Sequence, residues 1–326
     1  MNRDAEVDLI RRTLDLVDRK GELPSRTLSR ISIDRYSDPE RFRREKEVLF
    51  REFPLLVGFS SEVSGPGDYF THDASGVPIV VVRQPDGRLT AFLNVCRHRG
   101  CRVVDTGKGR AEAHLTCPFH GWRYGIDGRL LAVTHPDCFP GIDRSELGLV
   151  PLAVAERFGM VFVLPTPGET FDVDEWLGPL IQDLDSLGFD GYRMIRPKRA
   201  PGAMNWKLMM DANLETYHIA FLHRETAGMD VMNNLHLFDW ERPMLRGVLP
   251  RKSISGLSRA DSTAWRLTDH AAILYGIFPN SKLLLLEGYG FVLSTWPVDV
   301  GRSLLLGGTL VPPGDAKALA ETLADA

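Results

Sequence analysis

Two short segments that each supply one cysteine and one histidine constrain this chain more than any other feature of its sequence. The first is C-x-H, with Cys96 and His98, and the second is C-x2-H, with Cys117 and His120. Two thiolates and two imidazoles are the donor set of a [2Fe-2S] cluster in which one iron keeps two Cys ligands and the other takes two His ligands. We therefore expect two loops that the fold brings together.

Zinc is the main alternative for these four residues. Structural zinc motifs separate neighbouring ligands by two to four residues, and the one-residue gap between Cys96 and His98 fits that spacing poorly. Gly100, Pro118 and Gly121 flank the ligands, and they can hold tight turns whose backbone N–H groups point at cluster sulfurs. The sequence favours the iron–sulfur cluster.

The segments C-R-H-R-G and C-P-F-H-G-W resemble the Rieske family of iron–sulfur proteins. In the respiratory branch of that family, each loop carries a further cysteine and the two form a disulfide. This chain has Cys101 at the first of those positions and Phe119 at the second, so the bridge cannot form. The resemblance therefore indicates the oxygenase and ferredoxin branch.

A second candidate site lies in the segment from Asn205 to His223, which contains His218 and His223 as H-x4-H, with Glu215 three residues before the first. Two His and one carboxylate form the facial iron site of non-haem oxygenases. Taken alone, the pattern is equally typical of a helix with two ordinary histidines. Together with the cysteine and histidine loops, it resembles the α subunit, the large terminal component, of the ring-hydroxylating Rieske non-haem iron oxygenases.

The resemblance assigns His218 and His223 to mononuclear Fe(II). It assigns Glu215, with Asp211 as the fallback, to a bridge between an iron-binding His and a cluster-binding His of a neighbouring subunit in a homotrimer. The periodicity predicts a helix from Trp206 to His223. Residues five apart on a regular helix point about 140° away from each other, so this helix should bulge or end near Ala220 to Leu222. Glu215 and His218 should share one helical face.

The resemblance also implies a third iron ligand, an aspartate in a C-terminal helix. After the predicted strand Leu304 to Val311, the chain contains two aspartates, Asp315 and Asp325, and neither stands in a matching motif. We interpret both as solvated helix residues. We expect either a C-terminally truncated sequence or an incomplete iron site.

We predict an α+β protein with three segments: 1–43 packs with the catalytic domain, 44–164 is a small antiparallel β Rieske domain, and 165–326 is a helix-grip-like catalytic domain whose antiparallel sheet is flanked by helices. Asp86-Gly87 and Asp127-Gly128 each separate two apolar runs, which is a strong hairpin signal. The runs Leu283–Glu287, Gly290–Trp296 and Ser303–Val311 read as consecutive antiparallel strands.

Composition excludes several other classes. The net charge of −4 gives no general attraction for phosphate backbones, so we expect no nucleic acid partner. No run of about 18 apolar residues is present, so we expect no membrane span, and the N-terminus reads as an amphipathic helix rather than a secretory signal. Four cysteines in 326 residues indicate metal-binding thiolates in a reducing cytoplasm rather than a disulfide scaffold.

The resemblance implies a terminal oxygenase that passes electrons from the Rieske cluster to Fe(II). The reaction would be O2-dependent mono- or dihydroxylation, or oxidative demethylation, of a small organic substrate, with an aromatic compound favoured, as in aromatic hydrocarbon catabolism. Electrons would come from NAD(P)H through a separate reductase or ferredoxin. The alternative is a Rieske electron-transfer protein with an incomplete, inactive mononuclear site.

Overall fold

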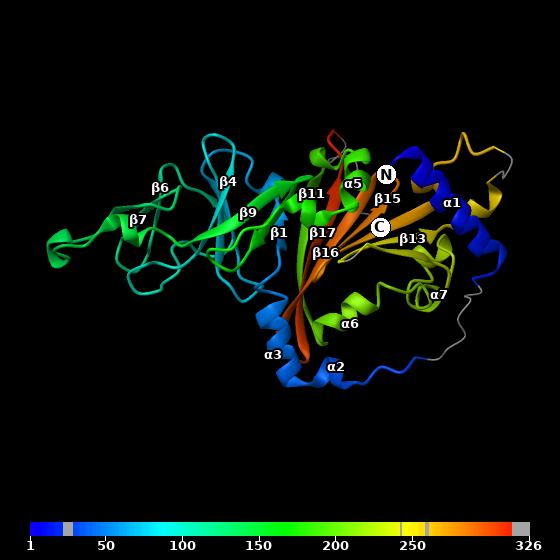
Figure 1. Cartoon of the computed structure of the whole chain (residues 1–326), viewed down its shortest axis with the longest axis horizontal. Helices are drawn as coiled ribbons and strands as arrows, with labels where there is room; N and C mark the ends of the chain where they lie inside the picture. The colour runs from blue at the N-terminus through cyan, green and yellow to red at the C-terminus, as the bar shows by residue number, and fades with distance from the viewer. Residues whose placement is uncertain (22–28, 242, 258–260, 315–326) are drawn as a thin grey trace. The chain divides into compact units, whose positions relative to one another are not determined.

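Two seven-stranded antiparallel sheets, each in its own structural unit, organise the chain in the computed structural model (Figure 1). The structure describes residues 1–21, 29–241, 243–257 and 261–314. One unit is Arg43–Trp176, and the other joins Met1–Phe42 to Leu177–Ala326. The predicted α+β class, with antiparallel sheets in both domains, is confirmed.

The unit Arg43–Trp176 contains a seven-stranded sheet of order β1-β10-β9-β4-β3-β2-β5 and a three-stranded sheet of order β6-β7-β8. Its strands are β1 (Leu55–Phe59), β2 (Asp68–His72), β3 (Ile79–Arg83), β4 (Leu89–Leu93), β5 (Lys108–Arg110), β6 (His114–Thr116), β7 (Arg123–Gly125), β8 (Leu130–Ala132), β9 (Pro151–Arg157) and β10 (Met160–Leu164). The helical segments along this part of the chain are α3 (Pro39–Val48), η1 (Ser60–Glu62), η2 (Pro136–Cys138), η3 (Arg144–Leu147) and α4 (Val173–Leu177).

The inner strand β3 is covered on both faces, which explains the apolar run Ile79–Val82. All five of its residues are buried, and successive side chains of a strand point to opposite faces. Val80 and Val82 pack into a core that includes Cys96 and Cys117. Ile79 and Val81 pack into the other core of the unit. The cysteine side chains of both loops are therefore packed in the first of these cores.

Both predicted Asp-Gly hairpins are present. Gly87 and Gly128 have φ angles of 85° and 86°, which residues with a Cβ rarely adopt. In each turn the aspartate carboxylate accepts a hydrogen bond from the backbone N–H two residues later, at 3.0 Å for Asp86 and 3.1 Å for Asp127. These turns set the register of β3 with β4 and of β7 with β8.

The second unit contains a seven-stranded sheet of order β11-β17-β16-β15-β14-β13-β12. The strands of this unit are β11 (Arg193–Gly202), β12 (Leu237–Glu241), β13 (Met244–Pro250), β14 (Ala271–Ile277), β15 (Ser281–Leu286), β16 (Tyr289–Asp299) and β17 (Arg302–Val311). The strands predicted after residue 280 correspond to β15, β16 and β17. Its helical segments are α1 (Arg3–Asp18), α2 (Asp34–Ser37), α5 (Leu180–Ser186), η4 (Phe189–Gly191), α6 (Trp206–Asp211), α7 (Ile219–Leu222), η5 (Ala227–Met229), η6 (Lys252–Gly256) and α8 (Leu267–His270).

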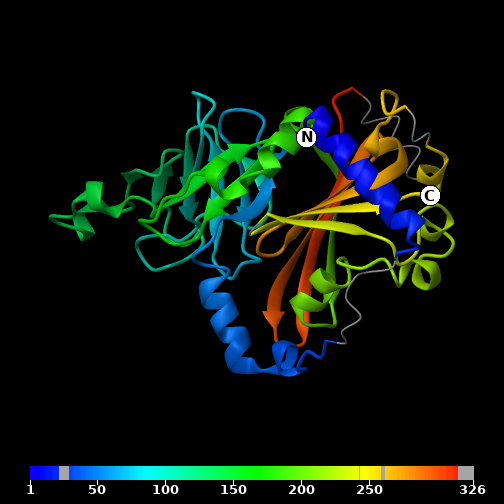
Figure 2. The ribbon, with the colours of Figure 1, turned by 45° about the vertical axis from the view of Figure 1, so that its right-hand side comes forward.

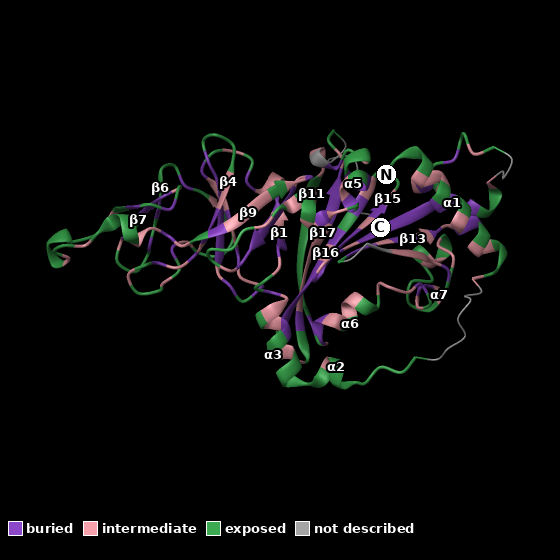
Figure 3. Ribbon diagram, viewed as in Figure 1, coloured by how far each residue is buried: buried purple, intermediate pink, exposed green. Residues whose placement is uncertain are grey.

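Helices cover both faces of this sheet. Helix α1 crosses β12 and β13 (Figure 2) and buries Leu9, Ile10 and Leu14, as the expected amphipathic helix should. Arg246 on β13 shares an ion network with α1, whereas the adjacent Leu245 lines a cavity with Met210 of α6. Because successive strand residues point to opposite faces, α1 and α6 lie on opposite sides of the sheet. Figure 3 shows the buried residues concentrated along the strands between them.

The α1 face contains a buried ion network. Arg246 pairs with Asp183 of α5 and with Asp239 of β12, each at 2.9 Å. Arg12 of α1 reaches Asp239 at 2.5 Å, and the Tyr275 hydroxyl lies 3.3 Å from Asp183. The network therefore ties two helices to three strands. In the described ranges, no helix has the length and apolar character needed to cross a membrane.

Candidate metal centres

The two cysteine-containing loops are closed by the same backbone hydrogen bonds. The first lies between β4 and β5 and the second between β6 and β7. The N–H of Cys96 donates to the carbonyl of Cys101 at 2.7 Å, and the N–H of Cys117 donates to the carbonyl of Trp122 at 2.8 Å. Each cysteine is thus fixed at the start of a six-residue turn, whatever side chains stand between.

A glycine completes each turn. Gly100 and Gly121 have φ angles of 72° and 71°, and each N–H donates to the carbonyl of the cysteine four residues earlier, at 2.9 and 3.0 Å. A Cβ on Gly121 would also lie 2.9 Å from the hydroxyl oxygen of Thr134, which donates to the carbonyl of His120 at 2.6 Å. The glycines expected from sequence to hold tight turns therefore do so.

The four expected donors come together in pairs. Cys96 and Cys117 are buried, with 3% and 2% of their surfaces exposed, and they belong to one core cluster. His98 and His120 lie closer to solvent, with ring centroids 4.7 Å apart at an angle of 66°. A buried cysteine pair and a more exposed histidine pair suit a cluster with one iron held by Cys and one by His. The residues present fit the [2Fe-2S] group.

All four cysteines carry free thiols. The prediction that Cys101 forms no bridge to the second loop is confirmed, because Phe119 stands at the position where a partner would be needed. Cys101 instead supplies the backbone carbonyl that closes the first loop.

Sequence reasoning missed Tyr124, whose hydroxyl lies 3.3 Å from the sulfur of Cys96. The backbone N–H of Arg97 donates to the same hydroxyl at 3.0 Å, which leaves the phenolic proton for the sulfur. Burial, followed by the contact with Cys96, raises the pKa of Tyr124 above its ordinary value. The hydroxyl therefore stays protonated and donates to a cluster ligand. The only sequence signal was an aromatic residue in the strand after the second loop.

Aromatic rings hold the imidazole of His98 in place. It stacks on Trp122 at 4.9 Å with an interplanar angle of 9°, and the edge of Phe139 meets it at 5.7 Å. Burial, and secondarily the charge of His120, lowers the pKa of His98. Both effects favour the neutral imidazole, which is the form that binds a metal.

The second candidate site is built around a one-turn helix, α7, with His218 at its N-cap and His223 at its C-cap. The two rings lie 5.4 Å apart at 70°. The predicted continuous helix from Trp206 to His223 is therefore wrong, because α6 ends at Asp211 and residues 212–218 are not helical. The expected end of the helix near 220–222 is present, because α7 ends at Leu222 and His223 is its C-cap. The rings of the two histidines can face each other because His218 and His223 flank the two ends of this single helical turn.

The end of α6 has a local cause. The side-chain amide of Asn213 donates to the carbonyl of Met209 at 2.6 Å, while the backbone N–H of Asn213 reaches Met210 at 3.2 Å. Asn side chains compete in this way with helical backbone bonds. The hydrophobic period continued across this position, so the sequence pattern gave no sign of the break.

Glu215 contacts His218 as expected, but from a turn rather than from a shared helical face. One carboxylate oxygen accepts from the backbone N–H of His218 at 3.1 Å, and the other contacts its Nδ1. Burial raises the pKa of Glu215, but the hydrogen bonds from His218 outweigh it and the net pKa lies below the ordinary value. An ionised carboxylate on Nδ1–H leaves Nε2 free to bind a metal.

The third ligand expected by resemblance is not found in the part of the chain that the structure describes. There, no group of three or more His, Cys, Asp or Glu side chains is arranged to hold one metal ion. Asp315 and Asp325 lie outside the described residues. Asp211, the fallback for the bridge, accepts a hydrogen bond from the Tyr36 hydroxyl at 2.6 Å. The described site thus offers two imidazoles with an orienting carboxylate.

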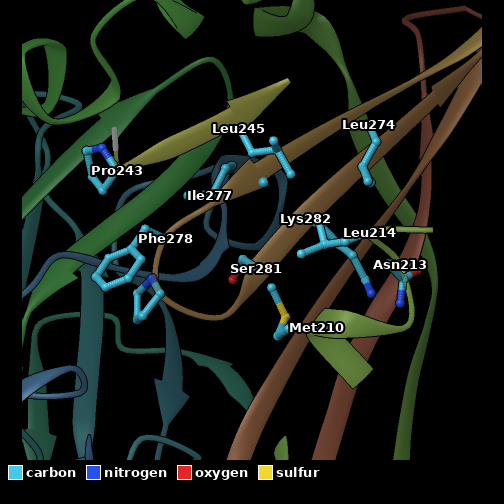
Figure 4. A pocket seen from close by; sticks show the side chains of 12 residues that line it. Met210, Asn213, Leu214, Pro243, Leu245, Leu274, Ile277, Phe278, Ser281 and Lys282 are labelled. Carbon is cyan, nitrogen blue, oxygen red and sulfur yellow. The ribbon is translucent and has the colours of Figure 1, made fainter. Parts of the chain in front are cut away.

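A cavity of about 120 Å³ lies beside this site, between α6 and the ends of β13, β14 and β15 (Figure 4). Asn213 and Leu214, which directly precede Glu215, form one wall. Lys282 of β15 also lines it, although only 5% of this lysine is exposed. Sequence analysis did not single out Lys282. A lone lysine in the run S-K-L-L-L-L was the available signal.

Family models match the two parts of the chain that contain these residues. A family model described as "Rieske [2Fe-2S] domain" matches residues 53–151, and one described as "Ring hydroxylating alpha subunit (catalytic domain)" matches residues 189–326.

Curated relatives include oxygenase subunits of several monooxygenases. The chain is 35% identical to the glycine betaine monooxygenase oxygenase subunit of Chromohalobacter salexigens over 204 residues, 63% of this chain and 44% of the relative. It is 35% identical over 191 residues to the carnitine monooxygenase oxygenase subunit of Escherichia coli, 58% and 50% of the two chains. It is 34% identical over 194 residues to chloroplastic choline monooxygenase of Spinacia oleracea, 58% and 44% of the two chains. The matches span about half the length of these relatives.

Solved structures share the fold over most of the chain. The quaternary ammonium Rieske monooxygenase CntA, in complex with an inhibitor, matches with a TM-score of 0.76 at 25% identity over 88% of this chain and 78% of the other. Naphthalene 1,2-dioxygenase with bound indole matches in fold, with a TM-score of 0.74 at 23% identity over 89% and 73% of the two chains. The paired family models and the architecture agree with the motifs: the chain belongs to the Rieske non-haem iron oxygenases and combines a Rieske [2Fe-2S] domain with the catalytic domain of a ring-hydroxylating α subunit.

Proposed function

We propose that this chain is a terminal oxygenase component that passes electrons from its Rieske cluster to a mononuclear Fe(II) site for O2-dependent oxidation of a small organic substrate. The observation that carries the proposal is the presence, in one polypeptide, of paired Cys and His loops and of a separate pair of facing histidines. Electrons would come from NAD(P)H through a separate reductase or ferredoxin, in the cytoplasm.

For the cluster, we assign Cys96 and Cys117 to one iron and His98 and His120 to the other. The cluster would supply one-electron transfer, at a potential set by its ligands and by hydrogen bonds to its sulfurs. Tyr124 would donate one of those hydrogen bonds. The exposed imidazole pair would be the side on which electrons enter and leave.

For the mononuclear site, we assign His218 and His223 as ligands of Fe(II), which would supply O2 activation. Glu215 would orient the ring of His218 and, in a homotrimer, link it to a cluster-binding histidine of the neighbouring subunit. The support for this role is the double contact of its carboxylate with the backbone and the ring of His218.

For the reaction, we infer that one oxygen atom enters a C–H bond while two electrons and two protons reduce the other to water. At an N-methyl group, the hydroxylated carbon would leave as formaldehyde, which is an oxidative demethylation. The relatives are monooxygenases named for glycine betaine, carnitine and choline, so mono-oxygenation of a compound of this kind is better supported than the dihydroxylation of an aromatic ring.

Iron analysis and O2 uptake test the proposal. The purified protein should contain about three irons per chain, two in the cluster and one mononuclear, and should show a rhombic EPR signal after reduction. With a Rieske reductase and NADH, O2 uptake should increase when a substrate is added. A protein with about two irons per chain and no substrate-dependent uptake would instead be an electron-transfer protein with an inactive second site.

A further inference from the structure

Lys282 occupies an unusual place for a charged side chain. It lies on β15, where its partner across the β14–β15 pair is Gly276, a residue without a side chain. A Cβ at Gly276 would lie 3.1 Å from the Cβ of Leu245, so this row of the sheet is already tightly filled. The glycine leaves the space over the sheet to the lysine, which extends into the cavity toward Asn213 (Figure 4).

The surroundings of Lys282 do not balance its charge. Its ammonium group donates to the carbonyl of Met209 at 3.2 Å, and the amide of Asn213 donates to that same carbonyl at 2.6 Å. An ammonium has three N–H donors, and burial of a cation without an anion is costly. The described lining contains no acidic residue; most of it is apolar, including Met210, Leu245, Leu274, Ile277, Phe278 and Pro279.

A purely structural role accounts for only part of this arrangement. A lysine near the last carbonyls of α6 would stabilise the helix end, and one hydrogen bond to Met209 does that. A neutral glutamine on β15 could donate the same bond without burying a charge. The positive charge itself therefore requires another explanation.

We propose that Lys282 and Asn213 bind a carboxylate of the substrate, so that this oxygenase acts on small organic acids with an otherwise apolar body. This inference rests on the proposed function, because it places the substrate in the cavity next to Glu215 and His218. The ammonium comes from one side, beside the Asn213 amide, whose second N–H makes only a long contact of 3.7 Å with the Met209 sulfur. The apolar wall covers the remainder of the molecule. Burial lowers the pKa of Lys282 to about 7 in the empty cavity, and a bound anion favours its charged form.

The same cavity disfavours a substrate that is only a cation. Quaternary ammonium groups are recognised by the faces of several aromatic rings, and the described lining contains one, Phe278. A choline-like alcohol would place its positive charge in a small cavity with Lys282. A betaine could bind with its carboxylate at Lys282.

Calorimetry with matched ligands tests this on the iron-loaded protein. The probes are benzoate with benzyl alcohol, and glycine betaine with choline; within each pair, one member carries a carboxylate and the other a hydroxyl. Lys282→Gln retains a donor without the charge, and Lys282→Arg restores the charge. Lys198→Gln is the control, because Lys198 is an exposed lysine on β11 of the same sheet. Circular dichroism checks that each variant is folded.

At least one carboxylate should bind the unaltered protein about tenfold or more tightly than its hydroxyl counterpart, as expected for a charged hydrogen bond. Lys282→Gln should abolish that preference, Lys282→Arg should restore part of it, and Lys198→Gln should leave it unchanged. The inference is overturned if neither carboxylate is preferred, or if the preference survives in Lys282→Gln.

These outcomes are separate from those of the proposed function. Binding is measured without turnover, so carboxylate selectivity together with absent O2 uptake would refute the oxygenase activity and leave the binding site standing. Substrate-dependent O2 uptake with choline and with neither acid would support the oxygenase and refute the role of Lys282.

Discussion

Replacing Arg246 by methionine should strongly destabilise the unit that contains the histidine pair. Arg246 is the one residue that joins Asp183 to Asp239. Asp239 would keep Arg12, so most of the cost arises at Asp183, whose side chain is only 4% exposed. Asp183 would retain the Tyr275 hydroxyl and the N-terminal ammonium of Met1, which lies 3.4 Å away. Removal of one partner from a buried ion pair costs about 3–5 kcal/mol, and we expect the lower end of that range, about 3 kcal/mol, because Asp183 keeps these two partners.

Urea unfolding with two probes measures this effect. Cluster absorbance reports on the unit Arg43–Trp176, whereas far-ultraviolet circular dichroism reports on both units. A shift in the circular dichroism transition without a shift in cluster absorbance therefore locates the destabilisation in the unit that contains Arg246. Arg302→Met is the matched control, because Arg302 is 71% exposed and pairs with the half-exposed Asp299; its loss should leave the unfolding midpoint nearly unchanged, since exposed ion pairs contribute little to stability. A destabilisation below 1 kcal/mol for Arg246→Met would refute the reasoning.

The same comparison has a pH dependence with a definite sign. Burial raises the pKa of Asp239, but its hydrogen bonds with Arg12 and Arg246 outweigh it and the net pKa is below the ordinary value. A carboxyl group with a depressed pKa in the folded state stabilises the protein above its unfolded pKa and loses that contribution as pH falls. The difference between Arg246→Met and the unaltered protein should therefore shrink below about pH 4.

Three further predictions concern single side chains. Tyr124→Phe should lower the reduction potential of the cluster, because the hydrogen bond to Cys96 stabilises the added electron; an unchanged potential in protein-film voltammetry would contradict this. Glu215→Gln should leave both metals bound but slow cluster oxidation in single-turnover experiments by orders of magnitude, whereas Glu225→Gln, an exposed control, should not; equal rates would remove the bridge. Lys282→Met should stabilise the fold by up to about 5 kcal/mol near neutral pH, since the pKa falls from 10.5 to about 7. At pH values between the folded and unfolded pKa of Lys282, the lysine is protonated in the unfolded chain and mostly neutral in the folded protein. The free energy of unfolding of the unaltered protein should therefore rise with pH in this range, and a flat profile would refute the burial argument.

The metal-binding loops were predictable because their information is local. Cys96, His98, Cys117 and His120 are recognised by spacing, and the glycines beside them by the turns that such spacing needs. Asp-Gly pairs likewise specify hairpins through two adjacent residues. Such features need no knowledge of distant parts of the chain.

The residues that surround the metals required the fold. Tyr124 reaches Cys96 across 28 positions of sequence, and Lys282 meets Met209 across 73; no local period encodes either contact. The helix predicted from Trp206 to His223 failed for a different reason. Hydrophobic periodicity records which face is apolar, and it does not register a single amide, such as that of Asn213, that takes over a backbone acceptor.

Both cluster loops are closed by backbone hydrogen bonds, so the atoms that hold the ligands in place differ from the side chains that are exposed at the loop surface. The cysteine and glycine positions are held by main-chain atoms, whereas the side chains of Arg97 and Arg99 are exposed. In the proposed oxygenase, substitutions at these outer positions would change which electron donor docks without altering the backbone bonds that hold the cluster ligands. A change of redox partner would then need no redesign of the metal site.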